Sequence, residues 1–279
     1  MSSDIINNIV RRQYTAHKGD DLLSQVSKVL CIVGPHHFIS AGFHPSGEVL
    51  IVNSSQFSLR EWDTEFIKHE LLDDPLLAAT EMIKSVFIAA TKNIIIPNEL
   101  YNTVEIAQKW FKGVYFCEPE EKINVAFCSK SEVHSCYSFP KGIEELFDTY
   151  AAELSFLPLN LIHLQYGATA ENLLQCTICE DYAIGTIHHN KILHWHQTFE
   201  YQNVEDIAYK LAAACQYFGI ELQHYPVFFN TTSIDQQVLL KKLHPYIPSL
   251  QNKKTGLSDI ISPEWSSTIL LFQQLNTCA

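Results

Sequence analysis

The sequence is poor in charge, and the charge that it has is mostly negative. Charged residues make up 18% of the 279 positions, with 19 basic and 31 acidic side chains and a formal net charge of −12. Nucleic-acid binding draws much of its free energy from Lys and Arg at phosphates, so this balance argues against a nucleic-acid partner. The basic pairs outside helical runs, Arg11-Arg12 and Lys253-Lys254, do not extend into a basic stripe.

Long hydrophobic runs are also missing. No uncharged apolar stretch approaches the ~20 residues that span a bilayer, so we expect no membrane span. The first 21 residues carry acidic and polar side chains where a secretion signal needs a hydrophobic run. Eight cysteines in a chain without such a signal are typical of free thiols in a reducing compartment, which predicts a cytoplasmic protein.

What the sequence does have is enough apolar material to fold, because hydrophobic residues make up 47% of the chain. A chain of 279 residues is long enough for two lobes that each bury a core. We predict an N-terminal arm over residues 1–28, a first lobe over 29–158 and a second lobe over 159–279.

One pattern of strands occurs twice and is the most informative feature of the sequence. The segments FISAGFHPSGEVLIVNSSQF (38–57) and YAIGTIHHNKILHWHQTF (182–199) each read as a strand, a tight turn and a second strand. Each is preceded by another apolar strand and followed by an amphipathic helix and a short strand. The second of these helices is predicted from Asn203, its cap, to Gly219, its stop. Residue identity between the halves is low, so the pattern is shared without demonstrated homology.

The remaining elements follow from hydrophobic periodicity and turn residues. Residues 62–84 predict two helices or one broken helix, and a further helix over 98–113 is expected to start at Asn98. Further strands are predicted over 86–91, 93–97, 123–129, 132–139, 161–167 and 224–232, and further helices over 141–154 and 234–247.

This plan resembles the ribonuclease-H-like fold, and its duplication resembles the actin-like ATPase superfamily. The segments that carry the likeness are KVLCIVGPHHFISAGF, TKNIIIPNELY and LLQCTICEDYAIGTIHHNKILHWHQTFEY. Within the superfamily the chain resembles a bacterial family of unknown function from Bacteroidetes and, more loosely, the actin-like domains of pilus and type II secretion assembly platforms. The resemblance covers roughly residues 29–247. It implies an α/β fold of two lobes, each with a mixed sheet flanked by helices.

The resemblance also implies a nucleotide site between the lobes, held by glycine-containing hairpin turns and by an Asp after the first strand of each lobe. In the first lobe the turn VGPHHF (33–38) keeps Gly34, but Pro35 lacks a donor and no carboxylate is present. In the second lobe the turn CEDYAIGT (179–186) places Asp181 suitably, but Ala183 stands where Gly is expected. The Gly-Gly pair expected after a late strand of the second lobe is replaced by FFNTTSID (228–235), and the chain contains no Gly-Gly.

Several independent parts of the nucleotide site are therefore missing, and we expect a degenerate cleft without catalytic residues or a cofactor. The role predicted for the chain is non-catalytic: a scaffold or regulatory protein that binds another protein or a small ligand. The alternative is an ATP-binding actin-like protein in which Asp181, Thr186 and Asn230 line an unusual phosphate and nucleoside site.

A second alternative comes from CTICEDYAIGTIHHNKILHWH (176–196), which holds two cysteines and four histidines. Cys176 and Cys179 lie three apart on a predicted strand, so they point to opposite faces about 10 Å apart and cannot share an ion. His194 and His196 are expected on one face, where they make half of a zinc site without an assigned third ligand. A zinc-binding module centred on these histidines is thus the weaker reading, and we expect no metal site.

Overall fold

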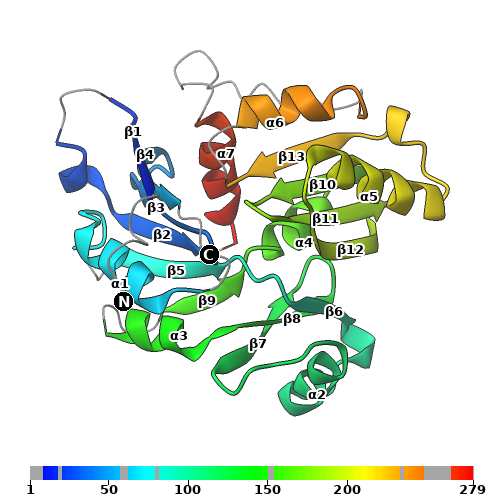
Figure 1. Cartoon of the computed structure of the whole chain (residues 1–279), viewed down its shortest axis with the longest axis horizontal. Coiled ribbons are helices and arrows are strands. Elements are labelled where there is room, and N and C mark those ends of the chain that lie inside the picture. The colour runs from blue at the N-terminus through cyan, green and yellow to red at the C-terminus, as the bar shows by residue number, and fades with distance from the viewer. Residues whose placement is uncertain are drawn as a thin grey trace.

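The computed structural model describes residues 9–17, 21–56, 62–78, 82–149, 154–232, 236–247 and 265–278. Its strands form a six-stranded, a four-stranded and a three-stranded sheet, arranged side by side in Figure 1. The six-stranded sheet is the central sheet of the first lobe, and the four-stranded sheet is the central sheet of the second. The repeated plan is confirmed, because each sheet contains a three-stranded antiparallel meander with a parallel strand beside the first strand of that meander.

The six-stranded sheet of the first lobe has the order β1-β4-β3-β2-β5-β9. Its strands are β1 (Val10–Thr15), β2 (Lys28–Val33), β3 (His37–Phe43), β4 (Val49–Gln56), β5 (Ile83–Ile88) and β9 (Ser155–Pro158). Strand β1 comes from within the predicted arm and pairs antiparallel with β4. Helices α1 (Thr64–Asp73) and α3 (Lys141–Asp148) contribute to the apolar core on one face of this sheet.

The four-stranded sheet of the second lobe has the order β12-β11-β10-β13. Its strands are β10 (Asn172–Ile178), β11 (Tyr182–His189), β12 (Ile192–Glu200) and β13 (Val227–Thr231). Helices α5 (Val204–Tyr217) and α6 (Gln236–Leu243) pack on one face, and α4 (Leu161–Gly167) packs on the other. The predicted ends of α5 are confirmed, because Asn203 forms a capping box with Asp206 and Gly219 adopts a φ of +68°.

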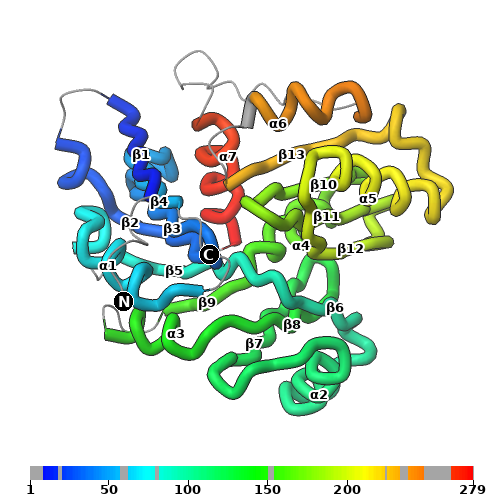
Figure 2. Tube along the Cα trace, in the orientation of Figure 1, coloured from blue at the N-terminus to red at the C-terminus, as the bar shows by residue number. Residues whose placement is uncertain are grey.

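The three-stranded sheet, of order β6-β8-β7, lies between β5 and α3 in the chain. It comprises β6 (Asn93–Pro97), β7 (Glu121–Cys128) and β8 (Val133–Pro140), and α2 (Val104–Val114) packs against it. Figure 2 shows the chain leaving the first lobe after β5, forming this sheet and returning through α3. Short 3₁₀ turns occur at Leu23–Gln25, Asn98–Leu100 and Leu222–His224.

Three predictions differ from the structure. Among the described residues of 62–84 there is one α-helix, α1, and strand β5 already begins at Ile83. Residues 161–167 were expected as a strand but form helix α4, in which Leu161, Ile162, His163, Leu164 and Gly167 are all buried. A helix buried on nearly every side has no polar face, so its periodicity cannot be told from that of a buried strand. The helix expected from Asn98 begins later, because Thr103 accepts a hydrogen bond from the backbone N–H of Ile106 and caps α2.

A last helix, α7 (Ser266–Leu275), lies between the two large sheets (Figure 1). Its side chains Ile269, Leu271, Phe272 and Leu275 are buried in a core that also contains Ile39 and Val52 of the first lobe and Tyr182 and Ile184 of the second. The two lobes therefore share one apolar core in addition to the core that each has under its own helices.

Candidate functional site

The two turns predicted to hold phosphates meet at the junction of the lobes. The first turn follows β2 and carries His36, and the second follows β10 and carries Asp181. Nε2 of His36 lies 3.0 Å from Oδ2 of Asp181, and the His36 side chain is buried. Asp181, the first of the three predicted site residues, is thus paired with a side chain of the opposite lobe.

Glycine at the first turn makes room for a side chain of the protein. A Cβ built on Gly34 would lie 2.7 Å from Cε1 of His37, so the imidazole packs against the glycine backbone. Burial, with a smaller contribution from neighbouring His36, lowers the pKa of His37 to about 3. A neutral ring therefore covers the backbone that a phosphate would need to approach.

Helix α7 occupies the end of β13, where the resemblance predicts contacts to a nucleoside. The amide of Asn230 donates to Oε1 of Gln274 at 3.2 Å. The backbone N–H of Thr231 donates to Oγ of Ser267 at 3.1 Å. The second predicted site residue, Asn230, is thus hydrogen-bonded to a helix of the same chain.

The third predicted residue, Thr186, belongs to a buried network on the face of the second sheet that α4 covers. His163 on α4 hydrogen-bonds through Nδ1 to Thr186 at 2.9 Å and through Nε2 to Thr177 at 2.7 Å. Thr186 also lies 2.9 Å from Nδ1 of His196, and Nε2 of that ring accepts from the amide of Asn160 at 3.0 Å. The three candidates therefore bond to three different elements and do not form one site through these contacts.

Burial sets the charge state of this network. It lowers the pKa of His196 to about 3 and that of His163 well below its ordinary value, with smaller effects from neighbouring histidines. Both rings are neutral at pH 7. Each imidazole then offers one donor and one acceptor, which suits hydroxyl and amide partners that do either.

Cys176 on β10 and Cys179, directly after the end of that strand, lie on opposite sides of the sheet, as predicted. Cys176 is buried in the core under α5, and Cys179 is buried in the core shared by the lobes. Burial raises the pKa of both thiols, that of Cys179 to about 12. Among the described residues, no group of three or more His, Cys, Asp or Glu side chains is arranged to hold a metal ion.

The expectation that His194 and His196 share a face is wrong. The pairing of β11 with β12 shifts register after Ile187, so that His188 pairs with Leu193 and one residue of β12 is unpaired. His196 faces Thr186, whereas the ring of His194 lies 5.6 Å from that of Phe218, at the end of α5. A bulge has no signature in the alternation of residue types, so the sequence could not reveal it.

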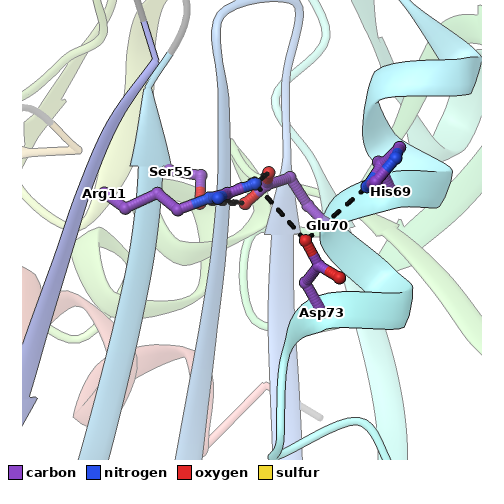
Figure 3. Close-up of polar contacts among 5 residues, drawn as sticks. All are labelled: Arg11, Ser55, His69, Glu70 and Asp73. Carbon is purple, nitrogen blue, oxygen red and sulfur yellow. Dashed lines mark hydrogen bonds and ion pairs between the residues drawn. The ribbon is translucent and has the colours of Figure 1, made fainter.

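A second polar cluster, which the sequence did not predict, lies on the α1 face of the first lobe (Figure 3). Nε of Arg11 on β1 lies 3.1 Å from Oε1 of buried Glu70, which also accepts from Ser55. Asp73 lies 3.5 Å from the Arg11 guanidinium and 3.6 Å from Nδ1 of His69.

One turn after Glu70, Asp74 is also buried and accepts hydrogen bonds from Ser40, from Asn53 at 2.7 Å and from the backbone of Leu76 at 2.9 Å. Burial raises the pKa of this carboxyl. The sequence did contain a signal for the burial of these two carboxylates. The helix period puts Glu70 and Asp74 on the same face as the apolar Ile67 and Leu71. Because these carboxylates are hydrogen-bonded to strand side chains, the cluster attaches α1 to the sheet.

Comparisons with known proteins agree with this architecture. A family model described as protein of unknown function (DUF3822) matches residues 48–250. A crystal structure from Bacteroides thetaiotaomicron, of a protein with an actin-like ATPase fold and unknown function, is similar with a TM-score of 0.68 at 16% identity, covering 90% of this chain and 98% of that one.

A chain of the PilM–PilN type IV pilus biogenesis complex is similar with a TM-score of 0.51 at 13% identity, covering 91% of this chain and 99% of that one. No curated protein sequence matches the chain. These findings confirm the predicted resemblance and fold class. In the part of the chain that the structure describes, no helix is both long and apolar enough to cross a bilayer.

Proposed function

The chain belongs to the DUF3822 family of proteins of unknown function, and we propose that it is a non-catalytic scaffold or regulatory protein whose actin-like fold binds a protein partner. The observation that carries the proposal is the pairing of His36 with Asp181 at 3.0 Å across the lobes. In this arrangement the carboxylate expected to position Mg²⁺ is engaged by a side chain of the protein.

The rest of the junction supports the same conclusion. His37 covers the backbone of Gly34, and α7 holds both Asn230 and the backbone of Thr231. A triphosphate needs several backbone N–H groups within reach of its oxygens. Pro35 supplies none, and the chain contains no Gly-Gly pair.

A protein-binding role is supported by exposed apolar side chains on α2 and directly after it. Trp110 and Val114 lie one turn apart on α2 and are exposed, and Phe116 two residues later is 77% exposed. Aromatic side chains of this kind are enriched in protein interfaces and contribute much of their binding free energy. One similar structure, that of the PilM–PilN complex, contains a protein partner.

Isothermal titration with Mg·ATP tests the non-catalytic part of the proposal. We expect no binding at micromolar concentrations. Micromolar affinity that Asp181→Ala abolishes would overturn the proposal in favour of the ATP-binding alternative. The substitution Glu180→Ala, at the exposed neighbouring position, is the control.

Affinity purification with cross-linking from the native cells tests the protein-binding part. The double variant Trp110→Ser/Val114→Ser is expected to lose a partner that the wild type retains. The matched control is Tyr209→Ser/Tyr217→Ser, which removes two exposed aromatic side chains from α5. A protein recovered equally with all three baits, or recovery of none, contradicts binding through α2.

A further inference from the structure

Helix α4 meets the polar face of the second sheet with two residues one turn apart, His163 and Gly167. The ring nitrogens of His163 are both hydrogen-bonded, to Thr177 and Thr186. Gly167 has no side chain to offer. Beneath it lie Gln175 and His188, because a Cβ at position 167 would stand 2.7 Å from Oε1 of Gln175 and 2.2 Å from Nδ1 of His188.

Gln175 and His188 are fully buried, yet none of their four polar atoms has a hydrogen-bond partner among the described residues. Buried polar groups are nearly always paired, because water lost on burial must be replaced by another partner. Two adjacent unpaired side chains, with both donors and acceptors, therefore indicate a partner outside the chain, either an ordered water or a bound ligand. The same sheet face satisfies its polar groups one helical turn away, so the arrangement is specific to this position.

A pocket of about 360 Å³ lies between the end of α4 and strands β10 and β13, and it is lined by neighbours of these two side chains. Leu173 and Phe228 line it, and they are the strand partners of His188 and Gln175 respectively. Residues paired across adjacent strands project from the same face about 5 Å apart. Gln175 and His188 thus lie beside lining residues of the pocket, behind Phe228 and Leu173 respectively, and do not themselves line it.

The chemistry of the pocket is neutral and partly aromatic. Burial, with a smaller effect of His194, lowers the pKa of His188 to about 4, so its ring is uncharged at pH 7. The described residues that line the pocket carry no ionised side chain. The rings of Tyr166 and Phe228 line the pocket with their centroids 6.2 Å apart.

We propose that this pocket binds a small uncharged molecule with a flat ring and a carboxamide-like group, which offers one donor and one acceptor to Gln175 and His188. Because Gln175 and His188 do not line the pocket, binding requires the side chain of Leu173 to move aside when the ligand enters. The ring of the ligand lies against Tyr166 and Phe228. The site is at the end of β13 remote from Asp181, and it is independent of the scaffold role proposed above.

Three isosteric probes test the proposal: benzamide, benzoate and benzamidine. They differ in charge but little in shape. Ligand-observed and protein-observed NMR titrations at pH 7.5 are expected to show saturable binding of benzamide and at least tenfold weaker binding of the two charged probes. Equal binding of benzoate, or no saturable binding of benzamide up to millimolar concentrations, would overturn the proposal.

The variants Gln175→Met and His188→Phe keep the volume of the buried side chains but remove their polar atoms. Each is expected to weaken benzamide binding at least tenfold, while the melting temperature without ligand stays equal to or above that of the wild type, because an unpaired polar group has been removed. The controls Gln197→Met and His194→Phe make the same changes at exposed positions of β12. Retained binding in both pocket variants, or a lower melting temperature in both, would show that the polar atoms serve the fold and not a ligand.

Discussion

His36 and Asp181, which are 145 positions apart in the chain, lie within hydrogen-bonding distance at equivalent turns of the two lobes. Each turn follows the first strand of its meander, so the similar plan of the two lobes places the two side chains opposite each other. In an actin-like ATPase these are the turns expected to hold phosphates. Here they contact each other.

A double-mutant cycle measures this pairing. His36→Ala and Asp181→Ala are each expected to lower the free energy of unfolding, and the coupling between them is expected to be about 1 kcal/mol, since the Asp181 side chain is half exposed. Urea denaturation at pH 7 gives the four values. Additive effects within about 0.3 kcal/mol would show that the two side chains do not stabilise each other.

Substitution of Phe272 tests the role of α7 in joining the lobes. The ring is fully buried in the shared core and lies 6.5 Å from that of Phe43. Phe272→Ala is expected to reduce the free energy of unfolding by about 3–5 kcal/mol and to speed limited proteolysis in both lobes. Gln273→Ala, at the neighbouring partly exposed position of α7, is the control. Cleavage confined to one lobe would contradict a joining role.

The neutral histidines predict loss of stability in mild acid. In the folded protein His196 has a pKa of about 3, whereas in the unfolded chain a histidine takes up a proton near pH 6.5. Between these values the unfolded state binds more protons, so the free energy of unfolding falls as the pH is lowered from about 6.5.

The free energy of unfolding is expected to fall less between pH 7.5 and pH 5 in His196→Gln than in the wild type, by about 1–2 kcal/mol. Urea denaturation at both pH values measures the difference. The exposed His69, changed to Gln, is the comparison. If the free energy of unfolding falls by the same amount between pH 7.5 and pH 5 in His196→Gln and in the wild type, the ring is not held neutral in the folded protein.

Arg11 is expected to stabilise the fold through Glu70. Arg11→Ala leaves a buried carboxylate without its cation and is expected to lower the free energy of unfolding by about 1–3 kcal/mol, reduced from the value for a fully buried pair because Arg11 is half exposed. Thermal denaturation and urea titration measure the effect. Arg12→Ala removes the same charge from the opposite face of β1. A similar loss in both variants would indicate a general charge effect.

The strand pattern was sufficient to predict the meanders, the strands β5 and β13 that follow them and α5, because alternation, turns and the Asn203 cap are local features. Strand β9 was not predicted. Helix α4 was missed because LIHLQYG is buried almost all round. For the candidate site, Asp181 was found from its place after β10. Its partner His36 was not, since contact between two distant turns depends on how the lobes pack.

The bulge that separates His194 from His196 also depends on pairing between strands. The unpaired atoms of Gln175 and His188 depend on what α4 places above them. Neither property is encoded in residue spacing alone, whereas the separation of Cys176 and Cys179 follows from strand geometry and was predicted.

Helix α7 has a consequence for synthesis of the protein on the ribosome. It contacts β4, more than 200 positions earlier in the chain, and covers the apolar face that includes Ile39 and Val52. That face of the first lobe cannot be covered by α7 until the helix has emerged from the exit tunnel. Contacts between such distant segments form slowly, and exposed apolar surface promotes aggregation in the interval. Nascent chains halted before residue 266 should therefore depend on chaperones.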